Sequence, residues 1–253
     1  MVKGLDKFKE YFKDYTESYI LIGGTASDQA MEEIGEEFRA TKDLDIVLSV
    51  EVLQPDFVKT FWEFIKAGGY KNKQKSTGKK LFYRFYDPDD NSYPVMLELF
   101  SRKPDALDYK GDGHLTPIPV DEDVSSLSAI LLDDGYYEFL HSGKREIDGL
   151  SVVKPEYIIP LKARAWIDLN ERRKNDEKVD SKDIKKHKND VFRLYRIISP
   201  ELSITLPEKV ESDLKKFMEA MTDETIDLKA FGYRGVKPEE VLEGIKKIYG
   251  LNH

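Results

Sequence analysis

YILIGGTASDQAMEEIGEEFRATKDLDIVLSV, residues 19–50, is the stretch that decides the fold. An apolar run ends at Gly23, Gly24 and Thr25, a polar segment follows, and a second apolar run opens at residues 43–45. This order predicts a strand, a helix that begins near Thr25, and a second strand. The two glycines allow a ligand to approach the backbone closely, and the first turn of the helix would direct free N–H groups at an anion.

Two carboxylates open the second strand. Residues i and i+2 of an extended chain share a face, so Asp43 and Asp45 point the same way while Leu44, Ile46 and Leu48 point toward the core. Adjacent carboxylates repel each other unless a cation lies between them, and Mg²⁺ prefers carboxylate oxygen together with substrate phosphate. The combination predicts phosphoryl or nucleotidyl transfer, whereas each motif alone is also typical of a plain turn or a solvated strand end.

The sequence Gly-Gly-Thr-Ala at 23–26, followed by Arg-x-Thr-x-Asp-hydrophobic-Asp at 39–45, resembles the nucleotidyltransferase superfamily and, within it, the AbiEii/AbiGii-type toxins. The resemblance implies an α/β (α+β) fold with a nucleotidyltransferase-type mixed sheet and flanking helices, followed by a C-terminal helical bundle. It also implies transfer of a nucleotide from a nucleoside triphosphate, with Mg²⁺ or Mn²⁺ as cofactor. The expected biology is the toxin component of a toxin–antitoxin or abortive-infection system, with RNA, above all tRNA, as acceptor and a cognate antitoxin as partner.

A third carboxylate, Glu98, lies in the otherwise apolar run 95–100. A charge in such a run must be paired, bound to a metal, or placed at an exposed strand end. The resemblance implies that Glu98 is the third catalytic carboxylate and joins Asp43 and Asp45 as a metal ligand. The alternative is a structural ion pair.

Lys162 lies within the apolar stripe of a helix predicted over residues 155–173, four residues after Ile158. An unpaired ammonium on a core-facing stripe is costly, so Lys162 should reach an anion or pair with a carboxylate while its stem is buried. AbiEii-type proteins carry a lysine on this helix within a Leu-Lys-x-x-Ala motif. The resemblance therefore implies that Lys162 takes part in catalysis by holding the nucleotide phosphates.

A further helix is predicted over residues 181–198, with Ser181 as its N-cap. Asp183, His187 and Asp190 share one face of it, a spacing that a metal site could use, although Asp183 near the helix start is also a favourable partner of the helix dipole. The resemblance implies that Asp190 orients the lysine or acts as a base. Asp183 is its competitor, with a role in nucleotide binding.

Length, composition and periodicity set the organisation. The 253 residues suit a nucleotidyltransferase-like α/β domain at 1–150 and a helical domain at 151–253. Neither a signal peptide nor an apolar run of the ~20 residues that a bilayer requires is present, so a soluble cytoplasmic protein without membrane contact is expected. Helices are predicted at 5–18, 55–67, 155–173, 181–198, 208–221 and 238–249, and strands at 70–75, 80–86 and 93–100 within a β-rich region that ends near 153.

The charge distribution is uneven. The net charge of −8 disfavours non-specific binding along nucleic acid. Residues 71–86 nevertheless contain five lysines and Arg84 and no acidic residue. We expect this basic hairpin, like the second cluster at 182–188, to be either a solvated face or a guide for an RNA backbone. No P-loop motif is present. The rival functions are a non-catalytic nucleotide or RNA sensor that keeps the fold, and an interaction protein.

Overall fold

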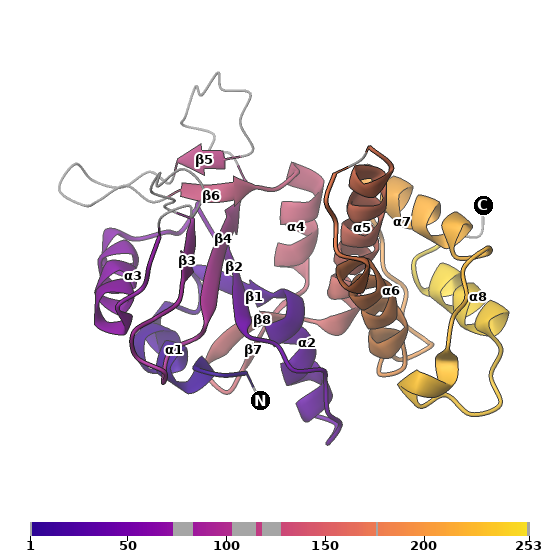
Figure 1. Ribbon diagram of the computed structural model, residues 1–253, viewed down its shortest axis with the longest axis horizontal. Coiled ribbons are helices and arrows are strands. Elements are labelled where there is room, and N and C mark those ends of the chain that lie inside the picture. Colours follow the sequence, from indigo (N-terminus) through magenta and orange to yellow (C-terminus); the bar gives the residue numbers. More distant parts are fainter. Residues whose placement is uncertain (1, 73–82, 103–114, 118–127, 176, 252–253) are drawn as a thin grey trace. The chain divides into compact units, whose positions relative to one another are not determined.

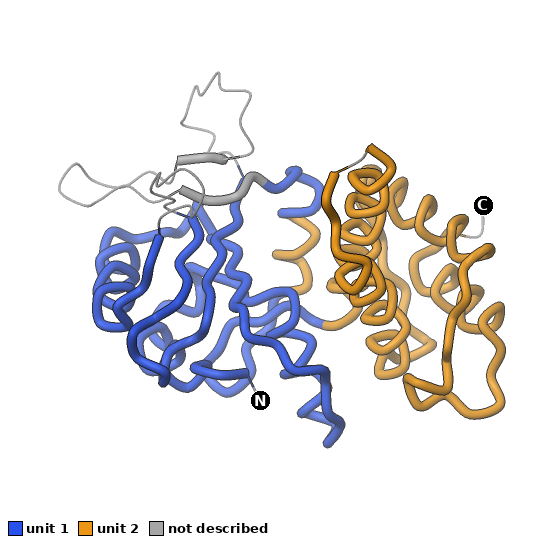
Figure 2. Tube along the Cα trace, in the orientation of Figure 1, with its two compact units in different colours: residues 1–137, 144–154 blue, residues 138–143, 155–253 orange. Residues whose placement is uncertain are grey.

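The computed structural model describes residues 2–72, 83–102, 115–117, 128–175 and 177–251. The chain forms two compact units, coloured separately in Figure 2. Unit 1 comprises Met1–Tyr137 and Lys144–Lys154, and unit 2 comprises Glu138–Gly143 and Pro155–His253. The predicted domain boundary at residue 150 stays a prediction, because compact units are defined by packing alone.

Unit 1 is built on a mixed sheet with eight strands in the described residues (Figure 1). The order is β5-β6-β4-β2-β1-β8-β7, and β3 pairs with β4. The pairs β2–β4, β4–β6 and β1–β8 are parallel and the others are antiparallel. The predicted α/β fold with a mixed sheet is therefore confirmed. The strands are β1 (Tyr19–Ile22), β2 (Asp43–Leu48), β3 (Arg84–Tyr86), β4 (Met96–Ser101), β5 (Leu115–Pro117), β6 (Ser128–Leu131), β7 (Lys144–Ile147) and β8 (Leu150–Val153).

Most predicted helices are confirmed, with ends shifted by a few residues. One was missed, because α4 lies where the sequence predicted only strands and turns. Its buried aromatic side chains favour strands by propensity, but packing of one helical face overrides that preference. The helices are α1 (Leu5–Phe12), α2 (Gly23–Glu32), α3 (Pro55–Gly68), α4 (Asp134–Ser142), α5 (Pro155–Lys174), α6 (Ser181–Tyr195), α7 (Glu208–Ala220) and α8 (Pro238–Ile248), with 3₁₀ turns η1 (Lys13–Tyr15) and η2 (Leu228–Phe231).

The two faces of the sheet have different chemistry. Residues paired across neighbouring strands project to the same face. Tyr19 pairs with Leu48, and its ring centroid lies 5.3 Å from that of Phe8 on α1. On the same face, Phe85 of β3 packs on Phe61 of α3 with ring centroids 5.6 Å apart. Helices α1 and α3 thus cover one face with an aromatic core, and the alternate strand positions project to the other face.

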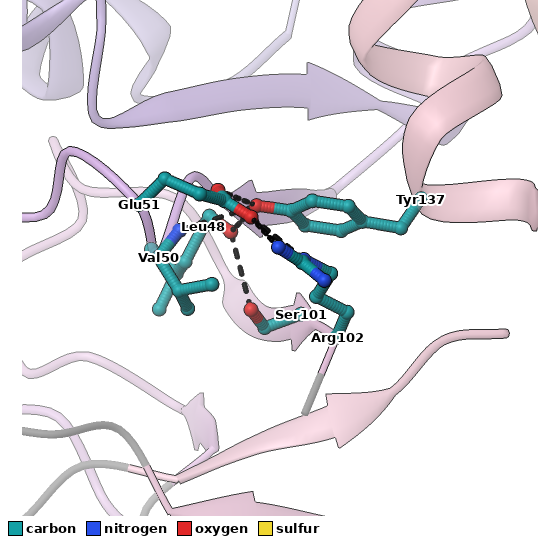
Figure 3. Close-up of polar contacts among 6 residues, drawn as sticks. All are labelled: Leu48, Val50, Glu51, Ser101, Arg102 and Tyr137. Carbon is teal, nitrogen blue, oxygen red and sulfur yellow. Dashed lines mark hydrogen bonds and ion pairs between the residues drawn. The ribbon is translucent and has the colours of Figure 1, made fainter. Parts of the chain in front are cut away.

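A polar cluster fixes the loop that follows β2 (Figure 3). The Tyr137 hydroxyl donates to Glu51 Oε2 at 2.6 Å, and Arg102 Nε donates to Glu51 Oε1 at 2.6 Å. The Val50 N–H donates to the Tyr137 hydroxyl at 3.2 Å. Burial alone would raise the pKa of Glu51, but these hydrogen bonds to Tyr137 and Arg102 hold that pKa below its ordinary value. The cluster ties α4 to the ends of β2 and β4.

Unit 2 accommodates a proline inside a long helix. Pro160 lacks the N–H that would donate to the carbonyl of Glu156 in α5. The Tyr249 hydroxyl, at the end of α8, donates to that carbonyl at 2.5 Å instead. Burial raises the pKa of Tyr249 well above its ordinary value, so the hydroxyl stays a donor. The last helix therefore completes the hydrogen bonding of α5.

None of the helices in the described ranges is both long and apolar enough to cross a membrane.

Candidate active site

The turn between β1 and α2 requires its glycines. Gly23 has φ +64°, and a Cβ there would lie 2.0 Å from Asp45 Oδ2. A Cβ on Gly24 would lie 2.4 Å from Thr41 Oγ1. The Thr25 hydroxyl donates to the Asp43 carbonyl at 3.2 Å and so joins the helix to the start of β2. The helix begins at Gly23, two residues before the predicted start, and its first turn contains no acidic residue.

The parallel pairing of β2 with β4 brings two carboxylates to adjacent positions. Asp45 pairs with Glu98, so both project to the face opposite the aromatic core. Asp43 lies two residues before Asp45 on that face, and both are half-buried while Leu44 between them is fully buried. The alternation predicted for this strand is confirmed. The structure places Asp43, Asp45 and Glu98 on one face beside the α2 N-terminus.

Glu98 has a partner that the sequence analysis missed. Arg84 of β3 pairs with Glu98 in register, and its Nε and Nη2 atoms both bond Glu98 Oε1. The Glu98 side chain is 15% exposed and that of Arg84 44% exposed. The sequence predicts that Arg84 belongs to the cations that guide RNA, but its apolar strand-like surroundings are also a signal for an ion pair with a neighbouring strand. The interaction leaves Glu98 Oε2 with no partner in the described residues.

These oxygen ligands suit a hard divalent cation. Mg²⁺ takes one or two protein carboxylates together with substrate phosphates, so Asp43 and Asp45 have the right chemistry to hold it. The described residues contain no group of three or more acidic or histidine side chains arranged as a metal cage. The structure therefore does not bring Asp43, Asp45 and Glu98 together as a three-carboxylate cluster, and the metal role of Glu98 stays a prediction.

Lys162 and Asp190 meet inside unit 2. Lys162 is 5% exposed, Asp190 is fully buried, and Lys162 Nζ lies 3.4 Å from Asp190 Oδ2. Arg193 approaches the other Asp190 oxygen at 3.5 Å. The structure thus gives Lys162 the carboxylate partner that its burial required, and Asp190 lies where it can orient the lysine. Arg193 was missed, although its spacing of three residues after Asp190 predicts contact on a helix.

The start of α6 differs from the prediction. Asp180, rather than Ser181, is the N-cap, and its side chain accepts from the Lys182 N–H at 2.8 Å. Asp has the same capping chemistry as Ser, and the sequence offered both in succession. Asp183 is exposed in the first turn, where a carboxylate favours the helix dipole. It does not join Lys162 and Asp190, so its role in nucleotide binding stays a prediction.

Part of the basic hairpin can be located. Lys71 forms an antiparallel bridge with Tyr86, next to β3. The four lysines expected to contact RNA phosphates lie outside the described residues; they are Lys73, Lys75, Lys79 and Lys80. Their role stays a prediction.

Neither a family model nor a curated protein matches the sequence. Among solved structures, the chain is similar to an antigenic nucleotidyltransferase-like protein from Paracoccidioides brasiliensis, with a TM-score of 0.43, 14% identity, and coverage of 94% of this chain and 97% of that one. It is also similar to JHP933 from Helicobacter pylori, with a TM-score of 0.39, 16% identity, and coverage of 98% and 88%. For the Megavirus polyadenylate synthase the TM-score is 0.37 and the identity 12%, and the match covers 87% of this chain and 36% of the synthase. The AbiEii/AbiGii resemblance stays a prediction.

Proposed function

We propose that the protein is a Mg²⁺- or Mn²⁺-dependent nucleotidyltransferase that moves a nucleoside monophosphate from a triphosphate to an acceptor hydroxyl. The observation that carries this proposal is the register that pairs Asp45 with Glu98, with Asp43 on the same face. The α2 N-terminus adjoins these carboxylates through the close approach of Gly23 to Asp45. A pure binding site for an anion gains little from carboxylates next to it, because they repel the anion unless a cation intervenes.

In this proposal the turn and the first carboxylates bind the substrate. Asp43 and Asp45 hold the metal, which when bound neutralises phosphate charge and aligns the triphosphate for in-line displacement of pyrophosphate. The unpaired N–H groups at the first turn of α2 receive phosphate oxygens, a role for which Gly23, Gly24 and Thr25 were predicted. Each group acts through position and charge, so no covalent nucleophile is required.

Glu98 is proposed to act on the acceptor. Arg84 bonds Oε1 of Glu98 and fixes the orientation of the carboxylate next to Asp45. The other oxygen, Oε2, is then the acceptor for the hydrogen of the incoming hydroxyl. A carboxylate oxygen accepts hydrogen bonds, which is the chemistry that this role requires. Arg84 is therefore a positioning residue in this scheme.

Lys162 is proposed to neutralise charge on the triphosphate, with Asp190 as the residue that orients it. The support from the structure is the 3.4 Å contact between Lys162 Nζ and Asp190 Oδ2 in a buried environment. The assignment of Lys162 to the phosphates rests on the AbiEii resemblance. Asp183 is kept as a candidate for nucleotide binding on the same ground.

The acceptor and the biological role complete the proposal. We propose RNA, with tRNA as the first candidate, as the acceptor, and toxicity relieved by a cognate antitoxin protein as the biology. The second function is a non-catalytic nucleotide or RNA sensor, which the proposed anion site at the α2 N-terminus would also serve.

The test is transfer of label from α-³²P nucleoside triphosphates to total RNA or to total protein in the presence of Mg²⁺. The proposal predicts labelled RNA, no label with EDTA, and a loss of orders of magnitude in Asp43→Asn and Asp45→Asn. Asp14→Asn, which removes an exposed carboxylate on η1, is the matched control and should leave transfer unchanged. Label only on protein would reject the RNA acceptor. Metal-dependent triphosphate binding without transfer to either class would favour the sensor.

A further inference from the structure

Unit 2 contains a cavity of about 480 Å³ that none of the proposed active-site residues lines. Helix α5, helix α6, residues 224–227 and η2 enclose it. This volume lies in the range of small-molecule sites, which are concave and mostly apolar with a few polar groups placed to orient the ligand. The cavity therefore has a volume that a small-molecule ligand could occupy.

The floor of the cavity is apolar and rigid. Trp166, Ile184 and Phe231 line it, and each is buried, with Trp166 only 7% exposed. Phe217 meets the Trp166 ring edge-on from another helix, with centroids 5.4 Å apart. Phe192 stacks on Phe231 at 6.5 Å. These fixed aromatic rings give the cavity an apolar floor that a planar ligand could contact.

The walls carry an excess of positive charge. The cavity is lined by four cations, Arg173, Lys185, Lys188 and Arg193, and by two acids, Glu224 and Asp227. Lys188 is neutralised by Glu224 at 2.6 Å, and Asp227 caps η2 by accepting from the Ala230 N–H at 3.3 Å.

Two of the cations remain available to a ligand. Within the described part of the chain, Arg173 and Lys185 have no acidic partner, and both are exposed. Arg173 Nη2 donates to Asn170 Oδ1 at 3.2 Å, and the other guanidinium N–H groups can serve a ligand. Arg193 lies with its guanidinium carbon 5.4 Å from the centroid of the Phe231 ring, so positive charge also borders the apolar floor. The whole chain has a net charge of −8, so the excess of positive charge at this cavity is local and favours an anionic ligand.

We propose that this cavity binds a nucleotide unit, either a free mononucleotide or one unit of an RNA strand. The base would lie against Trp166 and Phe231, and the phosphate would bond Arg173 and Lys185. Asn189, which also lines the cavity, carries the donors and the acceptor that the edge of a base requires. The Asn170 side chain instead donates to the Trp166 carbonyl at 2.8 Å and accepts from Arg173 at 3.2 Å. Base stacking combined with cationic phosphate contacts is a general mode of nucleotide recognition.

The chain offers a direct probe, because Trp62 and Trp166 are its two tryptophans. In a Trp62→Phe protein that also carries Asp43→Asn and Asp45→Asn, Trp166 alone reports binding, and EDTA removes metal-dependent binding. Failure of this site is then distinguishable from failure of the proposed function. AMP, and separately a single-stranded RNA oligomer, are titrated against Trp166 fluorescence. We expect saturable quenching.

The paired variants localise the ligand. Arg173→Ala with Lys185→Ala should weaken binding by about tenfold or more, the loss of at least one charge-assisted bond. Lys182→Ala with Lys186→Ala removes two charges from residues outside the cavity and should change affinity by less than about twofold. Quenching by AMP identifies the free nucleotide, and quenching by the oligomer alone identifies RNA. Absence of quenching by both ligands, or equal loss in the two double variants, would overturn the proposal.

Discussion

Replacing Gly23 by alanine tests whether the β1–α2 turn and Asp45 form one site. The residue has φ +64°, where a Cβ costs about 1–2 kcal/mol. The new Cβ would lie 2.0 Å from Asp45 Oδ2, whereas ordinary contact begins at 3.4 Å, so the carboxylate must move by about 1.4 Å. Because Oδ2 is the end of a flexible side chain, the fold can accommodate this shift. The carboxylate, however, leaves its position over the turn.

The chain offers a matched control. Gly35 has φ +71° and nothing within 4 Å of its added Cβ, so Gly35→Ala carries the backbone strain without the displacement. Urea unfolding should show a similar loss of stability, about 1–2 kcal/mol, for both variants. Nucleotide transfer should fall about 100-fold only in Gly23→Ala, the loss typical of a 1 Å misplacement. Equal activity in the two variants would refute the role given to the contact between Gly23 and Asp45.

Two further predictions concern charged side chains. Lys162→Met should destabilise unit 2 by up to about 3–5 kcal/mol because Asp190 stays buried without its ammonium, although Arg193 still approaches it at 3.5 Å. Addition of Asp190→Leu should restore part of that stability, and additive losses in urea unfolding would show that the pair is not coupled. The pKa of Glu51 lies below its ordinary value, so its stabilising contribution is present above about pH 4.3 and is lost as pH falls through the folded-state pKa. Glu51→Gln should therefore lower stability at neutral pH and flatten its decline in acid. Tyr137→Phe should reproduce part of this effect, since Tyr137 donates to Glu51, and an unchanged acid profile in both variants would contradict the interpretation.

Local patterns predicted much of unit 1. The alternation of Asp43, Leu44 and Asp45 predicted which side chains face the core, and the apolar run around Glu98 predicted the strand that carries it. The pairing of Asp45 with Glu98 depends on strand order, which no local pattern contains. The Arg84–Glu98 ion pair was missed for the same reason, since β3 and β4 must first be paired.

The errors in the helical regions have local causes. Helix α4 was not predicted, because its tyrosine and phenylalanine residues favour strands unless tertiary packing overrides that preference. The N-cap of α6 was placed at Ser181 because Asp180 and Ser181 are adjacent and both can cap. Lys162 was correctly expected to need an anionic partner, and the helical spacing of Asp190 and Arg193 was visible in the sequence. Their convergence on one buried site required the packing of α5 against α6.

The proposed active site requires that Asp43 and Asp45 bind metal and triphosphate together. The most direct measurement is calorimetry of a non-hydrolysable nucleoside triphosphate with and without Mg²⁺, on the native protein, Asp43→Asn, Asp45→Asn and the control Asp14→Asn. We expect Mg²⁺ to strengthen binding in the native protein and in Asp14→Asn, and this coupling to be lost in the other two variants because each lacks one anionic ligand. Unchanged coupling in both Asp43→Asn and Asp45→Asn would contradict the proposed site.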